Sequence, residues 1–184
     1  LFTAAQGSCS VRLPQGGFLM TPACLDLDLL EPQDLLWVTP ETETAHTTAQ
    51  LHAALYQARP EVNAVMTAQP PYLTAFAACR TYLDARTIPE SYLQLRDLLY
   101  GQFDAYYDAP ETLAAAFAPA KPAMLVENVG AVTTGNNLLK AFDRMEVMEA
   151  TARSVIDTAP LGKIIHITDD DIETIVEAFD LPRA

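Results

Sequence analysis

The feature that most constrains the fold is a long amphipathic helix in the last third of the chain. Its apolar side chains recur at steps of three and four residues, so they form one stripe along the helix. The stripe consists of Leu138, Phe142, Met145, Met148, Ala152 and Val155. A helix of this kind gains most of its stability by packing the stripe against another layer. Two apolar runs before the helix, at 123–127 and 131–134, are predicted to be strands.

Strand and helix patterns are mixed along the rest of the chain, which predicts a single α/β domain over residues 1–184. A turn at Gly16 and Gly17 predicts a hairpin and favours antiparallel pairing. Further strands are predicted at 35–38, as a buried strand, and at 62–67, and helices at 47–58, 70–82, 110–117 and 168–179. The stretch 90–107 is ambiguous. The last helix is expected to turn its apolar face inward, with Ile172, Ile175, Val176 and Phe179.

The charge balance excludes two classes of partner. The chain has 24 Asp and Glu against 11 Lys and Arg, a formal net charge of −13 at pH 7. Such a chain repels nucleic acids and anionic membrane surfaces unless its basic residues cluster, and in the sequence they are dispersed. No apolar run approaches the roughly 20 residues that span a bilayer. Three cysteines without a metal or redox spacing favour a reduced, cytoplasmic protein.

Five segments, in order along nearly the whole chain, resemble motifs of the class II aldolase/adducin family. Residues 7–12 (GSCSVR) resemble the G-N-x-S-x-R opening, and residues 18–22 (FLMTP) resemble a strand that ends in T-P. Residues 52–65 closely match H-x-x-x-Y-x-x-R-P-D-x-x-A-V, and residues 125–132 match L-L-x-N-H-G-V-V. The helix that follows has Glu146 and Glu149 in the spacing of the family's E-x-x-E helix.

The resemblance implies a three-layer α/β/α domain around a central, largely antiparallel sheet. It also implies a homo-oligomer, usually a cyclic tetramer with active sites at subunit interfaces. Enzymes of the family are zinc-dependent aldolases and epimerases of sugar phosphates, such as fuculose 1-phosphate and ribulose 5-phosphate, whereas adducin keeps the fold without the activity. The family has a further helix before the G-N-x-S segment, which we expect upstream of Leu1.

The zinc chemistry that the resemblance implies lacks its residues here. In the family, two histidines of a V-x-H-x-H strand end and one of the N-H-G turn bind Zn²⁺, which stabilises an enediolate. We assign these positions to Met66, Ala68 and Val129, none of which supplies a nitrogen or oxygen ligand. The family's acid/base glutamate corresponds to Thr48, whose hydroxyl cannot shuttle a proton near neutral pH as a carboxylate can. We therefore expect no metal and no cofactor.

The substrate-binding positions of the family are changed as well. The resemblance places the candidate phosphate contacts at Ser8, Thr21, Cys24, His46 and Thr47. Backbone N–H groups can still meet a phosphate there, so these residues remain candidate contacts to a small sugar-like ligand.

Several reactive residues have a structural interpretation beside the functional one. Glu127 is a weak candidate for a replacement acid, but it also fits a charge at a strand end. Cys24 has no basic neighbour in sequence to lower its pKa, which favours a structural thiol over a nucleophile. His46 fits either a ligand contact or a solvated helix start. His52 fits packing or hydrogen bonding within the helix pattern, and His166 fits a strand at 164–167.

Two hypotheses follow. The first, favoured by the missing zinc ligands, is a degenerate and non-catalytic family member that acts as an oligomeric or ligand-binding protein. The alternative is a divergent aldolase or epimerase of a sugar or sugar phosphate that uses Glu127, His46 or a tyrosine. A polar pocket at the old cleft would favour the enzyme, and a filled apolar one would favour the non-catalytic protein.

Overall fold

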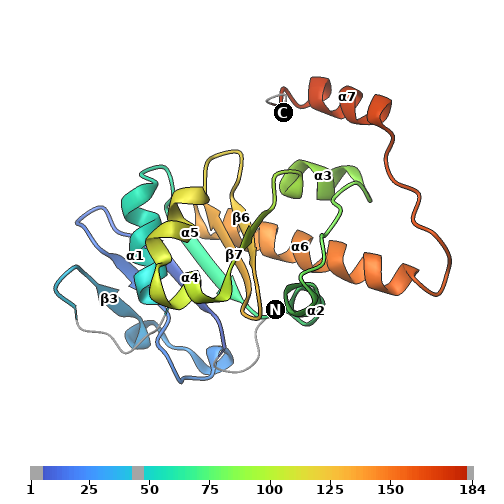
Figure 1. Ribbon diagram of the computed structural model, residues 1–184. Helices are drawn as coiled ribbons and strands as arrows, with labels where there is room; N and C mark the ends of the chain where they lie inside the picture. The colour runs from blue at the N-terminus through green and yellow to red at the C-terminus, as the bar shows by residue number, and fades with distance from the viewer. Residues whose placement is uncertain (1–5, 43–47, 182–184) are drawn as a thin grey trace.

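The computed structural model describes residues 6–42 and 48–181. It shows a seven-stranded sheet between two layers of helices, with strand order β3-β2-β1-β4-β7-β6-β5 (Figure 1). All neighbouring strands are antiparallel except β5 and β6, which are parallel. The strands are Ser8–Arg12 (β1), Phe18–Met20 (β2), Leu36–Val38 (β3), Ala64–Ala68 (β4), Leu99–Gly101 (β5), Ala123–Val126 (β6) and Gly130–Gly135 (β7). The predicted three-layer α/β/α fold with a largely antiparallel sheet is confirmed.

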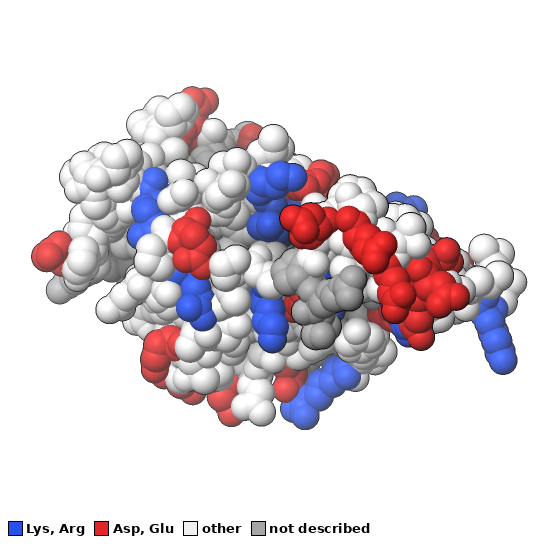
Figure 2. Space-filling model, turned by 90° about the horizontal axis from the view of Figure 1, so that it is seen from above, with Lys and Arg blue, Asp and Glu red and all other residues white. Residues whose placement is uncertain are grey.

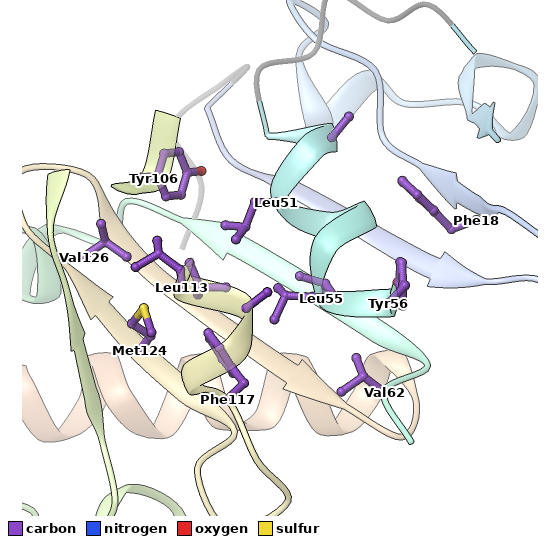
Figure 3. Close-up of a cluster of buried hydrophobic side chains, with 14 of the residues drawn as sticks. Phe18, Leu51, Leu55, Tyr56, Val62, Tyr106, Leu113, Phe117, Met124 and Val126 are labelled. Atoms are coloured by element: carbon purple, nitrogen blue, oxygen red, sulfur yellow. The ribbon is translucent and has the colours of Figure 1, made fainter. Parts of the chain in front are cut away.

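One face of the sheet is covered by α1 (Ala49–Ala58), α4 (Phe103–Asp108) and α5 (Pro110–Ala116). Leu51 and Leu55 of α1 are buried against Leu113 of α5 and against sheet residues such as Val126 (Figure 3). The helix α1 ends before Arg59, because the residue before a proline is pushed out of the α region. This end was predicted from the sequence.

The other face is covered by α2 (Pro71–Cys79), α3 (Pro89–Leu95) and α6 (Leu138–Thr158). The long helix of the sequence analysis is α6, and its central stripe residues Met145, Met148 and Ala152 are fully buried. The start of α6 is capped by Asn137, whose side-chain oxygen accepts a hydrogen bond from the Lys140 N–H at 2.9 Å. The helix predicted as the most constraining feature therefore packs as expected.

The last helix, α7 (Asp169–Ala178), differs from its prediction. Its cap is as expected, since the Thr168 hydroxyl accepts a hydrogen bond from the Asp171 N–H at 3.2 Å. Its apolar face, however, is only partly covered: no residue of α7 is buried, and Phe179 is 57% exposed. Figure 1 shows α7 lying outside the three layers, beyond α3. Amphipathic periodicity predicted the helix, but it could not say which surface the helix meets.

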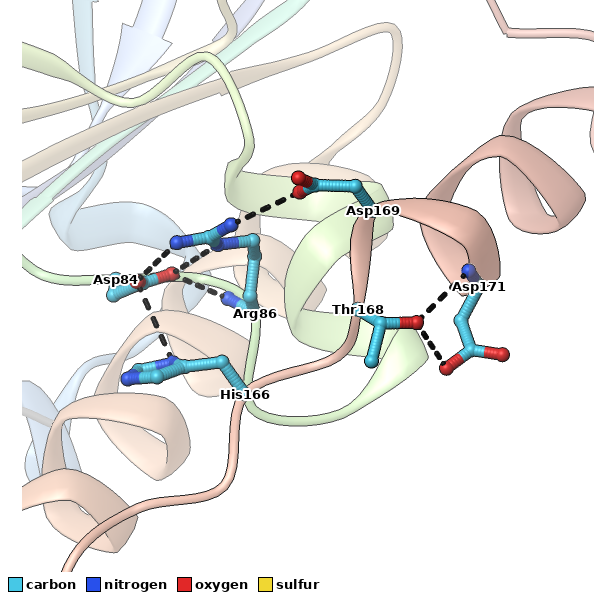
Figure 4. Close-up of polar contacts among 6 residues, drawn as sticks. All are labelled: Asp84, Arg86, His166, Thr168, Asp169 and Asp171. Atoms are coloured by element: carbon cyan, nitrogen blue, oxygen red, sulfur yellow. Dashed lines mark hydrogen bonds and ion pairs between the residues drawn. The ribbon is translucent and has the colours of Figure 1, made fainter.

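The segment that leads into α7 is irregular, and His166 lies in it rather than in the predicted strand. Figure 4 shows His166 and Arg86 both directed at Asp84. The His166 Nδ1 atom lies 3.4 Å from the Asp84 carboxylate, and Arg86 also lies 3.4 Å from Asp169 at the start of α7. Burial raises the pKa of Asp84, but hydrogen bonds and charge from Arg86 outweigh it and lower this pKa overall.

Two further predictions are corrected by the structure. The run 35–38 was predicted to be buried, but β3 is an edge strand in which Trp37 is 55% exposed. Two short 3-10 turns, Leu27–Leu29 and Pro32–Asp34, precede this edge. The ambiguous stretch 90–107 divides into most of α3, the strand β5 and most of α4, three elements too short for a periodicity to reveal.

No helix within the described part of the chain combines the length and the apolar character needed to cross a bilayer.

Candidate functional site

Several residues singled out from the sequence meet at one end of the sheet. The start of β1 pairs with the end of β4, where Ser8 is opposite Thr67. The end of β4 also pairs with the start of β7, where Ala68 is opposite Ala131. The turn between β6 and β7 contains Glu127 and lies at the same end. The strand register therefore gathers residues that are far apart in the sequence.

The turn and the end of β4 approach each other closely. At Gly130 the backbone has φ of 136°, and a Cβ atom there would lie 2.4 Å from the carbonyl oxygen of Ala68. Only glycine allows this approach. The close approach of the two backbones therefore explains why the turn needs a glycine at position 130. The same approach places Val129 next to the end of β4.

The strand geometry corrects the assignment of the zinc positions. Met66 and Ala68 are buried on the side of α2 and α6, whereas Val129 is buried on the side of α1. Side chains on opposite faces of a sheet cannot bind one ion together. Counted from Val65, the V-x-H-x-H motif instead places its histidines at Thr67 and Gln69.

The corrected positions still do not fit zinc. Thr67 supplies a hydroxyl, Gln69 an amide and Val129 no polar atom, so none of the three offers the imidazole that the family uses. Within residues 6–42 and 48–181, no three His, Cys, Asp or Glu side chains lie close enough together to hold a metal ion.

A buried network of hydrogen bonds fills the space on the α1 side. The hydroxyl oxygen of Ser8 lies 2.7 Å from that of Thr67, 3.0 Å from that of Thr48 and 3.1 Å from the His52 Nε2 atom. The other ring nitrogen, Nδ1, lies 2.7 Å from the hydroxyl oxygen of Ser10. Ser8 and His52 are fully buried. The positions of the lost glutamate and of one lost histidine thus both contact the same serine.

The network continues to the far end of α1. The Tyr56 hydroxyl lies 2.7 Å from that of Ser10, and burial raises the pKa of Tyr56 to about 12 although Ser10 and Arg12 oppose it. Arg12 donates to the carbonyl oxygens of Tyr56, Arg59 and Val62 at 2.8–2.9 Å. The motif segments 7–12 and 52–65 are therefore in direct contact. Neither segment alone indicates this network, because it depends on the strand register.

The candidate phosphate contacts are placed as follows. The side chain of Ser8 belongs to the network, and the Thr21 hydroxyl accepts a hydrogen bond from the Cys9 N–H at 3.1 Å. Cys24 is exposed and has φ of 62°. His46 and Thr47 lie outside the described residues. The Ser8 hydroxyl is thus used within the protein, whereas the Thr21 hydroxyl accepts one hydrogen bond and can still donate one.

Glu127, the predicted carboxylate, lies in a polar pocket. It forms an ion pair with Arg80, and its side chain is only 17% exposed while that of Arg80 is 73% exposed. Arg80 follows α2 in the left-handed conformation, with φ of 49°. The pocket has a volume of about 510 Å³ and is lined by Arg80, Gln102, Phe103, Asp104, Glu127 and Asn128. We call it the Arg80 pocket.

A second, more apolar hollow of about 290 Å³ shares Arg80, Gln102 and Glu127 with this pocket. Tyr82 and Tyr100 line it, with ring centroids 5.9 Å apart. Tyr100 is anchored, because its hydroxyl accepts a hydrogen bond from the Leu83 N–H at 2.8 Å. Together the two hollows offer a cation and amide groups beside an aromatic wall. No sequence motif marks Arg80.

Comparisons with known proteins point to one family. Residues 1–156 match the family described as the Class II Aldolase and Adducin N-terminal domain. A 3-oxo-tetronate 4-phosphate decarboxylase of Haemophilus influenzae is 29% identical over 181 residues, with 92% of this chain and 85% of the relative covered. The enzyme of that name from Pectobacterium atrosepticum is 29% identical over 183 residues, with 92% and 82% covered.

Solved structures confirm the fold. The crystal structure of YgbL from Escherichia coli has a TM-score of 0.82 at 23% identity, with 95% of this chain and 88% of that chain covered. L-fuculose 1-phosphate aldolase from Glaciozyma antarctica has a TM-score of 0.81 at 21% identity, with 96% and 74% covered.

The expectation of a non-catalytic protein was wrong, because the curated relatives are named as sugar-phosphate enzymes. The step that failed leads from the missing zinc ligands to the loss of a polar cleft. The missing imidazole ligands predict a cleft that is partly filled or apolar, but a polar pocket with an ion pair lies beside the turn of residues 127–130.

Proposed function

This chain belongs to the class II aldolase/adducin family, and from this we propose that it is a carbon–carbon lyase of a phosphorylated sugar acid. The substrate class that we infer is a four-carbon 3-oxo acid with a terminal phosphate. The support is the similarity to 3-oxo-tetronate 4-phosphate decarboxylases, which extends over 92% of this chain and 85% of one relative. This is the enzymatic alternative of the sequence analysis, with a changed active site.

The chemistry of such a substrate defines what the site must do. When a 3-oxo acid loses CO₂, the electron pair of the broken carbon–carbon bond moves toward the 3-oxo carbonyl and leaves an enediolate. A proton then adds to the carbon that lost CO₂, and a three-carbon hydroxyketone phosphate results. The barrier falls when positive charge or hydrogen-bond donors meet the oxygen on which negative charge develops.

The observation that supports this function best is Arg80 beside the turn from which the metal-binding histidine is missing. Its guanidinium presents several N–H donors and a permanent positive charge. We propose that it stabilises the enediolate oxygen. Glu127 orients Arg80 through the ion pair and is itself approached by the Asn128 amide at 3.4 Å. In this proposal Glu127 is a positioning residue.

The phosphate group is proposed to bind toward the start of α1 and the loop after β2. Because the Ser8 hydroxyl is used internally and the Thr21 hydroxyl already accepts one hydrogen bond, we expect the contacts near Thr21, Cys24, His46 and Thr47 to come mainly from backbone N–H groups.

The test is CO₂ release from 3-oxo-tetronate 4-phosphate by the full chain, with detection of the hydroxyketone phosphate. Arg80→Met is expected to lower kcat/KM by about 10²-fold, the usual effect of removing one donor to a developing oxyanion. Arg153→Met, which changes an exposed arginine on α6, is the matched control and should leave kcat/KM unchanged.

The outcomes separate the proposal from its rivals. Release of CO₂ that is equal in wild type and Arg80→Met would remove Arg80 from the mechanism. No turnover of the 3-oxo acid, together with cleavage of a sugar 1-phosphate, would replace decarboxylation by an aldol reaction.

We also propose that the chain forms a homo-oligomer, with a tetramer as the prediction from the resemblance. Large apolar side chains are exposed at several places, among them Trp37 on β3, Leu139 on α6 and Ile165 in the segment before α7, the last of which is 92% exposed. Light scattering on the purified chain would give its mass directly, and a mass equal to one chain would contradict this proposal. The cytoplasmic location remains a prediction from the cysteine usage.

A further inference from the structure

A second pocket lies at the opposite end of the sheet from the Arg80 pocket. It is bordered by the start of β4 and the end of β7, which pair through Ala64 and Gly135. Its volume is about 300 Å³, and its charged lining residues are Arg59, Glu61, Lys140 and Arg144. We call it the basic pocket. Figure 2 looks toward this end of the molecule, and basic side chains are visible at the surface there.

The lining of this pocket is positively charged, whereas the molecule as a whole is negatively charged. The chain has a net charge of −13, yet three cations line this hollow beside one exposed carboxylate, that of Glu61. Lys140 is only loosely neutralised, because its Nζ atom lies 3.4 Å from the Asp143 carboxylate and the two side chains are 53% and 39% exposed. A local surplus of positive charge in an acidic protein favours the binding of an anion.

The two arginines are held in place by backbone carbonyls. Arg59 donates from Nη2 to the carbonyl oxygen of Ala115 at 2.6 Å, and Arg144 donates from Nη1 to that of Thr134. In both side chains the Nε atom is buried and has no hydrogen-bond partner among the described residues. Buried donors without acceptors are unfavourable, so a small rotation that brings an anion's oxygens to these groups would be stabilising.

The environment of Arg144 agrees with this reading. Burial lowers the pKa of Arg144, and the nearby carboxylate of Asp143 compensates only in part. A bound anion would supply the missing compensation.

We propose that the basic pocket binds a phosphate dianion, either free or as the phosphate group of a small metabolite. Planar guanidinium groups match phosphate oxygens in charge and in geometry. The volume is at the lower limit of small-molecule pockets and suits a phosphate ester of a few carbons. The site lies at the other end of the sheet from the candidate active site, so it is independent of the proposed reaction.

The test is isothermal titration of the full chain with inorganic phosphate at constant ionic strength. Wild type is expected to bind one phosphate saturably, and Lys140→Met to weaken this binding at least fivefold. Lys140 suits the experiment because its side chain is 53% exposed and its partner Asp143 is also open to solvent, so its removal should not disturb folding. Lys163→Met changes an exposed lysine far along the chain and is the matched control.

Two further measurements locate and identify the anion. Phosphate binding should persist in Arg80→Met, whereas its loss there with full binding in Lys140→Met would place the phosphate beside Arg80 and overturn the proposal. Absence of saturable binding by wild type, or equal affinity in wild type and Lys140→Met, would overturn it as well. In a second arm, tighter binding of glycerol 3-phosphate than of inorganic phosphate would support a phosphorylated metabolite, and equal affinity would support free phosphate.

Discussion

Ser8 shows how one small side chain can connect three distant parts of the sequence. Its hydroxyl oxygen lies within 3.1 Å of polar atoms in Thr48, His52 and Thr67. These residues belong to the start of α1, to its first turns and to β4, so the serine joins the helix to the sheet. Where the family has a carboxylate and one of its imidazoles, this chain has the hydroxyl groups of Thr48 and Thr67, which both lie within hydrogen-bond distance of Ser8.

Ser8→Ala is expected to lower the free energy of unfolding by about 1–3 kcal/mol, because it removes a hydrogen-bonding group from a fully buried network. Urea unfolding followed by circular dichroism measures this change. Ser154→Ala is the control, since the Ser154 hydroxyl is exposed and donates only to a carbonyl of its own helix. Equal stability of the two variants would mean that the network contributes little to folding.

Cysteine reactivity provides a second prediction for single residues. Burial raises the pKa of the Cys9 thiol to about 12, whereas Cys24 and Cys79 are exposed. Because the thiolate is the reactive form, Cys9 should be modified last by iodoacetamide at pH 8. Peptide mass spectrometry after timed quenching gives the order. Early modification of Cys9 in folded protein would contradict the burial that the structure shows there.

At the scale of elements, hydrophobic periodicity predicted which segments form helices and which helix faces are apolar. Five of the six predicted stripe residues of α6 lie in or against the core, because residue spacing determines which face of a helix is apolar, whereas Leu138 at its start is 42% exposed. The exposed edge position of β3 and the partly uncovered face of α7 could not be predicted, since both depend on which elements become neighbours. The short strand β5 was missed because three residues show no period.

The turn between β6 and β7 depends on Gly130. Gly130→Ala is expected to lower the free energy of unfolding by about 1–3 kcal/mol from backbone strain alone, with the clash against the Ala68 carbonyl oxygen added to it. Gly16→Ala separates the two effects, because Gly16 also has a positive φ but a Cβ atom there meets nothing within 4 Å. Thermal unfolding of both variants should show the larger loss for Gly130→Ala, and equal losses would rule out the clash.

The attachment of α7 is expected to be weak. Within the described part of the chain, the helix and the segment before it make three polar contacts to the body: the Ile167 N–H with the Arg86 carbonyl oxygen at 2.9 Å, His166 with Asp84 at 3.4 Å, and the exposed pair of Arg86 with Asp169. Such exposed pairs contribute only about 0–1 kcal/mol. Trypsin should therefore cut first after the exposed Lys163, as intact-mass spectrometry over time would show. Earlier cleavage within the three layers would mean that α7 is the better protected part.

At the scale of the whole molecule, the net charge of −13 opposes compactness. On the face seen in Figure 2, acidic side chains gather toward one side while basic ones are dispersed. Added NaCl screens this repulsion, so the thermal midpoint should rise between roughly 0.02 and 0.3 M salt. Differential scanning fluorimetry measures it, and KCl at equal ionic strength controls for a specific effect of sodium. A falling midpoint would show that attractive ion pairs outweigh the repulsion.

The candidate site was predicted only in part, because its geometry depends on how distant segments of the whole molecule pack together. Motif order indicated the family and marked Glu127, because both are properties of the linear sequence. Arg80 and the contact of Ser8 with His52 depend on the register of paired strands and on where α2 ends. The inference from lost zinc ligands to lost activity failed because it considered the ligands without the pocket around them.

The position of β4 at the centre of the sheet has a consequence for how the protein forms during synthesis. Its partners are β1, near the start of the chain, and β7, which follows more than sixty residues later. Pairings between strands so far apart form slowly, since a long loop must close first. Until β7 has left the ribosome, a buried central strand has one open edge. The growing chain therefore passes through a stage that is vulnerable to aggregation, and this stage is where a chaperone would be needed.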